Sequence, residues 1–420
     1  MKNQEFFKNK TITVVGLARS GVACANLLHS LGSKVSVTDS NDNPETREAA
    51  KRLISRDIPV ELGKHSRKFF ENRDFIVVSP GVAAKSQPIT WAGESGIPVL
   101  SEIEVAWSLC PGTVIAITGS GGKTTVTTLI GNVIRASGKK AFICGNIGNP
   151  FSGEVENIGP EDFVSLEVSS FQLENIIRFK PHIAVILNFN RNHLDRHADM
   201  QEYLNAKKRI FANQDSGDFL VLNANDTALK DLGGQARSKT VFFKASVEFN
   251  PNQQAVLAVA SILGIEKKVC NRVLSEFEGL EHRMEFVAQV KGVRFINDSK
   301  ATLGESTVWA INNISSPIIL IAGGKDKGVD YSLISGPGKG KIKEVIVIGQ
   351  AANTIKGALR KSFKIEEAGN LQEAVMLAFN KSSPGDSVLL SPMCSSFDMF
   401  ANYEERGRVF KQAVKDLYGP

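Results

Sequence analysis

The stretch "TVIAITGSGGKTT" (113–125) joins an apolar, β-branched run to a glycine-rich turn that ends in Lys123 and Thr124. A strand, such a turn and a following helix aim several backbone N–H groups into one concavity, and the helix dipole adds partial positive charge there. The next residues, 124–138, form a plausible helix that ends at Gly138. The stretch therefore predicts a phosphate-binding loop. The usual loop, G-x-x-x-x-G-K-[ST], has a glycine where this chain has Ile117, which weakens a generic GTPase or kinase interpretation.

Short β-branched runs alternate with helical stretches through nearly all of the 420 residues. Most of these runs are apolar on both faces, which is typical of parallel strands covered by helices on each side. We therefore expect a doubly wound α/β fold. The expected strands are 11–17, 34–39, 75–81, 113–119, 163–169, 182–189, 219–224, 293–299, 317–324, 344–349 and 386–392.

Chain length favours about three domains, at roughly 150 residues per domain. We predict an N-terminal Rossmann-like domain over 1–101, a central P-loop ATPase-like domain with a parallel sheet over 102–280, and a C-terminal Rossmann-like domain over 281–420. Ligands of such sheets bind beyond the carboxyl ends of the strands, so the candidate site residues are sought in the strand-exit loops.

Composition excludes several classes of protein. The hydrophobic content of 42% and charged content of 22% are ordinary for a globular protein, and no apolar run approaches the ~18 residues that span a bilayer. The start, "MKNQEFFKNK", lacks the apolar core of a signal peptide, so we expect a cytoplasmic protein without a membrane partner. The net charge of +6 is scattered, which argues against nucleic acid as a partner. Five well-separated cysteines form neither a disulfide framework nor a C-x-x-C pair.

A variant loop, T-G-x-x-G-K-[ST]-[ST], fits residues 118–125 and resembles the ATP loop of the Mur ligase family, which includes folylpolyglutamate synthases. Further stretches that resemble family blocks, in family order, are "LEVSSFQLE" (166–174), "NHLDRH" (192–197), "NDSKAT" (297–302) and "SPMCSSFDMFANYEERG" (391–407). Two of them, "SSFQLE" and "NDSKAT", resemble the branch that adds D-glutamate to UDP-N-acetylmuramoyl-L-alanine in peptidoglycan synthesis. The alternatives are a sister ligase that adds another amino acid and a folylpolyglutamate-synthase-like ligase.

The resemblance implies that ATP phosphorylates a carboxylate and that an amine then attacks the acyl phosphate. Carboxylate and triphosphate repel one another, so Mg²⁺ ions and lysines are needed at the site. Asn252 is the better candidate for an adenine-side asparagine, and Asn250 competes with it. The expected ATP-binding residues are Thr118, Gly119, Ser120, Gly121, Gly122, Lys123, Thr124, Thr125, Asn252, Arg283 and Asp298.

The same resemblance implies two Mg²⁺ ions. Thr124 and Glu167 would hold the first ion and His193 the second, while Lys207 would carry a CO₂-derived carbamate that bridges to the second ion. Lys123, Lys207 and His193 are the expected catalytic residues. Two of these site residues also have a plainer interpretation. Glu167 could be a helix cap or part of an ion pair, and Lys207 could belong, with Lys208, to a solvated helix face. The spacing of His193, Asp195 and His197 also suggests zinc, but no fourth ligand lies nearby in the sequence.

"VVGLARSG" (14–21) predicts strand, tight turn and helix, and its glycine pattern is also compatible with a dinucleotide. An NAD-dependent oxidoreductase is therefore the alternative from another class, although it leaves the phosphate loop unexplained. By resemblance, the UDP part of the substrate would contact Arg19, Ser20, Asp39, Ser40, Ser79 and Gly81. Asn146, in the central domain, would reach the bridging part of the substrate.

The last family blocks imply the binding site for D-glutamate, whose two carboxylates require cations and hydroxyl groups. The expected residues are Lys300, Thr302, Lys327, Ser396 and Tyr403, and the plainer interpretation of Lys300 and Lys327 is surface lysine. We expect a monomer whose partners are these small-molecule substrates.

Overall fold

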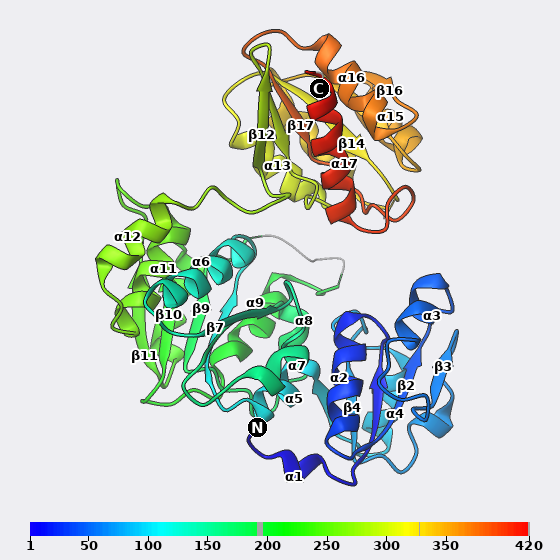
Figure 1. The fold of residues 1–420 in the computed structure, drawn as a ribbon, viewed down its shortest axis with the longest axis vertical. Helices are drawn as coiled ribbons and strands as arrows, with labels where there is room; N and C mark the ends of the chain where they lie inside the picture. Colours follow the sequence, from blue (N-terminus) through cyan, green and yellow to red (C-terminus); the bar gives the residue numbers. More distant parts are fainter. Residues whose placement is uncertain (191–195, 327, 419–420) are drawn as a thin grey trace. The chain divides into compact units, whose positions relative to one another are not determined.

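The computed structural model describes residues 1–190, 196–326 and 328–418, and the chain divides into two compact units, Met1–Phe277 and Glu278–Pro420. The first unit holds two α/β sheets and the second unit holds one. Helices pack along each sheet (Figure 1). The expected α/β class is confirmed, and every strand predicted from the sequence is present.

The first sheet has the strand order β3-β2-β1-β4-β5, and its neighbouring strands are parallel. β1 lies between β2 and β4, so the loops that leave β1 and β4 diverge and open a crevice at the carboxyl ends of the strands. The elements are α1 (Gln4–Phe7), β1 (Thr11–Val15), α2 (Arg19–Ser30), β2 (Lys34–Asp39), α3 (Pro44–Ala50), β3 (Val60–Leu62), η1 (Arg67–Phe69), β4 (Phe75–Val78), α4 (Gln87–Glu94), β5 (Val99–Ser101) and α5 (Glu102–Leu109).

The middle sheet has the order β11-β10-β9-β6-β8-β7 and is also parallel. Its crevice opens at the end of β6, where the glycine-rich turn leads into α6. The elements are β6 (Thr113–Thr118), α6 (Lys123–Ala136), β7 (Ala141–Gly145), α7 (Phe151–Glu154), η2 (Val155–Asn157), β8 (Phe163–Glu167), α8 (Ser170–Leu173), β9 (Ile183–Ile186), α9 (Met200–Lys208), η3 (Arg209–Phe211), β10 (Phe219–Asn223), α10 (Thr227–Lys230), η4 (Gly233–Gln235), β11 (Lys239–Phe243), α11 (Pro251–Ile262) and α12 (Lys267–Ser275).

The sheet of the second unit has the order β12-β13-β17-β14-β15-β16. β12 and β13 are antiparallel and joined by a tight turn, so this sheet is mixed, whereas the sequence predicted parallel strands. The elements are β12 (Glu285–Val290), β13 (Val293–Asn297), α13 (Gly304–Asn312), β14 (Ile318–Gly323), η5 (Tyr331–Ile334), α14 (Ser335–Gly338), β15 (Ile342–Ile348), α15 (Ala352–Leu359), β16 (Lys364–Glu367), α16 (Leu371–Lys381), β17 (Ser387–Leu390) and α17 (Tyr403–Asp416).

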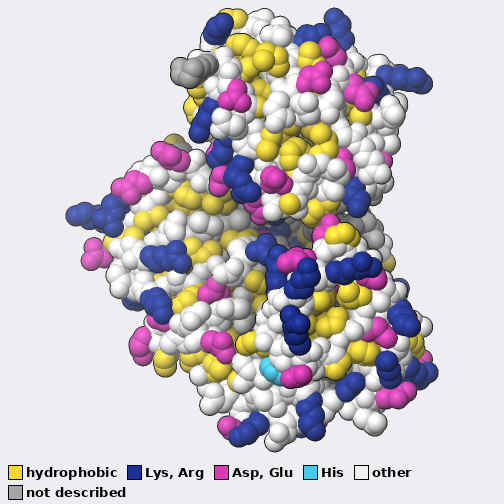
Figure 2. Space-filling model, turned by 45° about the vertical axis from the view of Figure 1, so that its right-hand side comes forward, with side chains coloured by type: hydrophobic (Ala, Val, Ile, Leu, Met, Phe, Trp, Pro, Cys, Tyr) yellow, Lys and Arg dark blue, Asp and Glu magenta, His cyan; other side chains and the backbone are white. Residues whose placement is uncertain are grey.

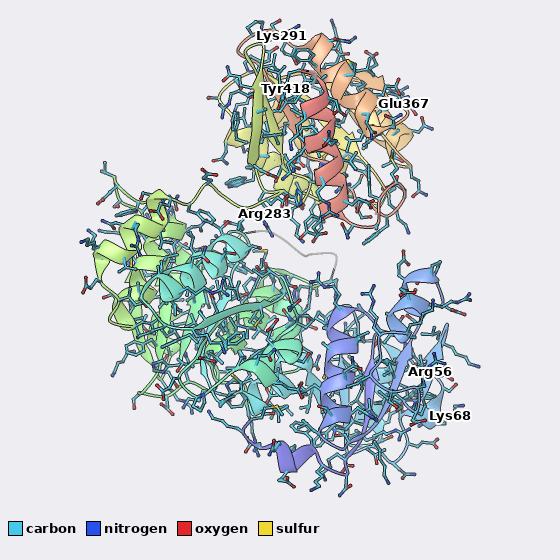
Figure 3. All side chains as sticks on the ribbon, in the orientation of Figure 1. Arg56, Lys68, Arg283, Lys291, Glu367 and Tyr418 are labelled. Atoms are coloured by element: carbon cyan, nitrogen blue, oxygen red, sulfur yellow. The ribbon has the colours of Figure 1, made fainter. Side chains whose placement is uncertain are left out.

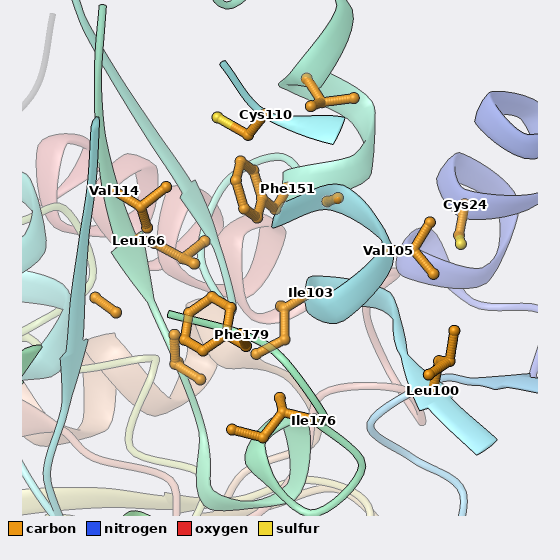
Figure 4. Packing of buried hydrophobic residues seen from close by; sticks show 14 of the residues in the cluster. Cys24, Leu100, Ile103, Val105, Cys110, Val114, Phe151, Leu166, Ile176 and Phe179 are labelled. Atoms are coloured by element: carbon orange, nitrogen blue, oxygen red, sulfur yellow. The ribbon is translucent and has the colours of Figure 1, made fainter. Parts of the chain in front are cut away.

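One buried cluster runs from the first sheet into the middle sheet (Figure 4). Leu100 belongs to β5, while Val114 and Leu166 belong to β6 and β8. Ile103 and Val105 of α5 are fully buried in the same cluster. Because burial of apolar surface is the main stabilising term in folding, this shared core explains why two sheets form one unit.

Charged side chains of both signs are scattered over the surface drawn in Figure 2. Arg56 and Lys68, labelled in Figure 3, are exposed examples on the first sheet. None of the described helices is long and apolar enough to cross a membrane.

Candidate active site

The glycine-rich turn after β6 has the backbone conformation that its sequence requires. Gly119 has φ +156° and Gly122, the N-cap of α6, has φ +78°, a conformation that L-residues with a Cβ adopt at a cost. A Cβ atom at Gly122 would lie 2.5 Å from Asn252 Oδ1 on α11. The turn therefore needs glycine at this point, and it places Asn252 beside the predicted phosphate site. Asn250 instead forms a capping box with Gln253.

The loop after β9 is hydrogen-bonded to this turn. The backbone N–H of Gly121 donates to Asn188 Oδ1 (2.8 Å), and the backbone N–H of Ser120 donates to the carbonyl of Asn188 (3.1 Å). Lys123 Nζ donates to the carbonyl of Gly119 (3.0 Å), and Thr124 and Thr125 lie in the first turn of α6. Asn188 was not predicted from the sequence, because its partners Ser120 and Gly121 lie far away in the chain.

Lys207 and Lys208 are sharply different in the structure. Lys207 is 1% exposed, and its Nζ donates to the Gly119 carbonyl (3.0 Å) and lies 4.4 Å from the ring centroid of Tyr203. Burial, together with the nearby charge of Lys123, lowers the pKa of Lys207 well below its usual range. An unprotonated amine is the form that reacts with CO₂. Lys208, by contrast, is half-buried, so the interpretation as a solvated face is wrong for Lys207.

Glu167 ends β8 directly beside the phosphate loop, because it pairs in register with Ile117 of β6. Its side chain is 2% exposed, and its Oε1 accepts a hydrogen bond from Asn146 Nδ2 (2.8 Å). Its Oε2 is buried without a hydrogen-bond partner among the described residues. A buried carboxylate oxygen left without a donor suits a cation, so Glu167 and Thr124 fit the predicted Mg²⁺.

His193, Asp195 and Lys327 lie outside the described residues, so their predicted roles stay predictions. His197 is 2% exposed; its Nε2 lies 3.0 Å from Ser170 Oγ, and its ring stacks on Phe171 with the centroids 5.3 Å apart. This histidine is packed among aromatic rings.

A cavity of about 750 Å³ opens at the carboxyl edge of the first sheet and extends to the middle sheet. Its walls include every residue predicted to contact the nucleotide-linked substrate: Arg19, Ser20, Asp39, Ser40, Ser79, Gly81 and Asn146. Arg19 donates to the carbonyl of Gly148, which links the two sheets at the cavity rim. His65 also lines the cavity and was not singled out from the sequence.

The carboxylate of Asp39, at the end of β2, accepts hydrogen bonds from the loops after β1 and β2. Its Oδ2 accepts from the backbone N–H of Leu17 (2.7 Å), and its Oδ1 accepts from Asn41 (2.8 Å). Asp39 therefore stabilises the turn after β1, and its predicted contact with the UDP part of the substrate stays a prediction.

The remaining predicted residues belong to the second unit. Arg283 lies just before β12, where Figure 3 labels it. Asp298 follows β13 and accepts from Ser391 Oγ (3.0 Å) and from the backbone N–H of Met284 (3.3 Å). Burial raises the pKa of Asp298 to about 7, although these hydrogen bonds and the charge of Arg283 oppose the shift.

Two strand-exit loops carry the residues predicted for D-glutamate. Lys300 Nζ lies 3.7 Å from the ring centroid of Tyr403, at the start of α17, and Thr302 lies two residues further on in the same loop. Ser396, in the loop after β17, is 2% exposed. Arg406 joins these two loops.

Arg406 of α17 is fully buried, and the sequence analysis missed it. Its Nε donates to Ser299 Oγ (3.0 Å) and its guanidinium also donates to the carbonyls of Ser299 (2.8 Å) and Cys394 (3.1 Å). One side chain thus ties the loop after β13 to the loop after β17.

Comparison with known proteins agrees with this arrangement. Three family models match the chain in order: a Mur ligase MurD-like N-terminal domain over residues 10–101, a Mur ligase middle domain over 117–284 and a Mur ligase glutamate ligase domain over 282–394. The chain belongs to the Mur ligase family.

Curated relatives of this Mur ligase are similar over nearly their whole length. A UDP-N-acetylmuramoylalanine–D-glutamate ligase of Geotalea uraniireducens is 42% identical over 97% of this chain and 98% of its own. A protein of the same name from Koribacter versatilis is 38% identical over 98% of both chains.

Solved structures of other Mur ligases share the fold. UDP-N-acetylmuramate-alanine ligase MurC from Thermotoga maritima has a TM-score of 0.62 at 17% identity, covering 97% of this chain and 100% of its own. MurF from Acinetobacter baumannii has a TM-score of 0.56 at 15% identity, covering 98% and 93%. ATP and Mg²⁺ dependence is general in this family.

Proposed function

We propose that this Mur ligase adds D-glutamate to UDP-N-acetylmuramoyl-L-alanine, using ATP, in peptidoglycan precursor synthesis. The observation that supports the substrate best is the single cavity that collects every predicted UDP-substrate residue. At one side of this cavity Asn146 is hydrogen-bonded to Glu167, beside the phosphate loop. A nucleotide-linked acid in this cavity can therefore place its carboxyl group near the terminal phosphate of ATP.

Phosphoryl transfer needs positioning and charge neutralisation at the phosphate loop. α6 begins at the turn over residues 119–122 and presents its first backbone N–H groups, and Lys123 supplies a cation for the outer phosphates. Thr124 and Glu167 would hold Mg²⁺, which when bound neutralises phosphate charge. The substrate carboxylate attacks the γ-phosphorus, ADP leaves, and an acyl phosphate forms.

Lys207 supports a second part of the proposal. Burial lowers the pKa of its amine well below the usual range, and in the unprotonated form this amine would form an N–C bond with CO₂ and lose a proton, which produces a carbamate anion. This anion and His193 would hold a second Mg²⁺. The amine of D-glutamate, held through its carboxylates by Lys300, Thr302, Lys327, Ser396 and Tyr403, then attacks the acyl carbon and phosphate leaves.

The adenine side would contact Asn252, Arg283 and Asp298. We propose further that the enzyme acts as a monomer in the cytoplasm, with these small molecules as its partners. The predicted domain limits, 101/102 and 280/281, are part of the same proposal.

A panel of acceptors tests this function. Purified protein, ATP, Mg²⁺ and UDP-N-acetylmuramoyl-L-alanine are mixed with D-glutamate, with L-alanine or with a diamino acid. A separate reaction contains folate as the acid and L-glutamate as the acceptor. We expect phosphate release and a product of matching mass with D-glutamate alone. Release with another pair would assign the chain to a sister ligase, and binding of NAD without phosphate release would favour an oxidoreductase.

A further inference from the structure

Arg196 of the middle domain holds a loop of the first sheet. Its two terminal nitrogens donate to the carbonyls of Pro80 (2.9 Å) and Val82 (3.0 Å), in the loop that follows β4. Pro80, Gly81 and Val82 all line the 750 Å³ cavity. The two sheets belong to the same compact unit, so this bidentate contact joins two parts of one unit.

The other side of the guanidinium rests on an aromatic ring. The Arg196 Cζ atom lies 4.0 Å from the ring centroid of Phe171 in α8. Phe171 stacks in turn on His197, whose ring lies 5.1 Å from that of Tyr203. A planar guanidinium that stacks on a ring and donates two parallel hydrogen bonds is held in one orientation, and lysine cannot reproduce both contacts.

Phe171 lies four residues after Glu167, the predicted metal ligand, and its neighbour Gln172 lines the same cavity. Arg196 therefore connects the substrate wall of the first sheet to the segment that follows β8. The wall does not need Arg196 in order to fold, because Ser79 Oγ donates to the Gly16 carbonyl (3.0 Å) and the Ser79 N–H donates to the Val15 carbonyl (2.9 Å). What Arg196 adds is the placement of this wall relative to the middle sheet.

We propose that Arg196 is a positioning residue. It fixes the position of the Pro80–Val82 wall relative to Glu167 and so places the acid end of the substrate at the phosphate loop. This inference rests on the proposed function. UDP alone needs only the first sheet, whereas the complete substrate must meet both sheets. Displacement of the Pro80–Val82 wall should therefore lower the affinity for the complete substrate more than the affinity for UDP.

Three variants test this role: Arg196→Ala, Arg196→Lys and the control Arg209→Ala. Arg209 also donates to two backbone carbonyls, those of Leu173 (2.7 Å) and Ile176, but within the middle domain alone. Calorimetry measures the dissociation constants of UDP and of UDP-N-acetylmuramoyl-L-alanine, and steady-state kinetics measures kcat/KM for the latter and KM for ATP. Thermal melting verifies that each variant is folded.

For Arg196→Ala we expect UDP affinity to change little, while kcat/KM for the complete substrate falls about 10- to 100-fold. The dissociation constant of UDP divided by that of the complete substrate should therefore fall. We expect an intermediate effect for Arg196→Lys, no change in KM for ATP, and wild-type behaviour of Arg209→Ala. Equal loss of UDP and complete-substrate affinity, or an unchanged ratio, would overturn the proposal. If the wild-type protein fails to bind the complete substrate or to release phosphate, the proposed function itself fails, which is a separate result.

Discussion

Lys207 and Lys208 are adjacent on α9, yet only Lys207 is buried, and this burial lowers the pKa of Lys207. Sequence alone could not separate them, because helix periodicity without a partner surface does not say which side chain points inward. Resemblance favoured Lys207, and its burial against Gly119 and Tyr203 now gives a physical reason.

The two lysines form a matched pair for mutation. Lys207→Ala should lower phosphate release by about 100-fold or more, because the predicted carbamate anion cannot form. Lys208→Ala should retain most of the activity. Added short carboxylic acids should partly restore Lys207→Ala, since a free carboxylate can replace the carbamate. Equal activity of the two variants would contradict this role.

Asp298 predicts a pH dependence of stability. Its pKa is about 7 in the folded protein and near 4 in the unfolded chain, so the folded state binds the extra proton between these values. The free energy of unfolding should therefore fall as pH rises from about 4 to about 7, with a slope of up to about 1.4 kcal/mol per pH unit from this group.

Asp298→Asn should remove that slope. Denaturant unfolding of both proteins from pH 5 to pH 8 measures it, and the variant should gain stability relative to the wild type as pH rises to 7. A constant difference between the two proteins across this range would show that the carboxyl group titrates normally.

Other site residues could not have been found from sequence patterns. Asn188, Arg196 and Arg406 act through hydrogen bonds to backbone groups that lie far away in the chain. Such partners are selected by tertiary packing, so no local spacing reveals them. The glycine turn, Ser40 and Ser79 were accessible because each directly follows an apolar strand.

At the scale of the elements, the strands that the sequence analysis missed are the two edge strands of each sheet: β3 and β5, β7 and β11, β12 and β16. Central strands are apolar on both faces, which makes them visible in the sequence. Edge strands are short or partly exposed, as in β3 (Val60–Leu62) and β16 (Lys364–Glu367), and these two strands also carry charged residues that discourage further pairing.

The turn between β6 and α6 makes a prediction of its own. Gly122→Ala should lower the free energy of unfolding by about 1–3 kcal/mol, because alanine is strained at φ +78° and its Cβ would meet Asn252. Gly121→Ala is the control, since its Cβ would have open space and its φ is not positive. Chemical denaturation without nucleotide measures both. Equal losses would contradict the strain at Gly122.

On the scale of the whole molecule, the second unit has its own cores on both faces of its sheet, and all their residues lie after position 277. A fragment of residues 278–420 should therefore fold by itself, with cooperative thermal unfolding by circular dichroism. Loss of cooperative unfolding in this fragment would show that the unit depends on the first 277 residues.

The central claim is that the phosphate loop transfers a phosphoryl group to the carboxylate of the nucleotide-linked substrate. Its most direct test uses UDP-N-acetylmuramoyl-L-alanine with both alanine carboxylate oxygens replaced by ¹⁸O. With ATP, Mg²⁺ and D-glutamate, mass spectrometry of the released phosphate should find one ¹⁸O atom per phosphate, because the acyl phosphate leaves with a carboxylate oxygen. Unlabelled phosphate, released while product forms, would contradict the account.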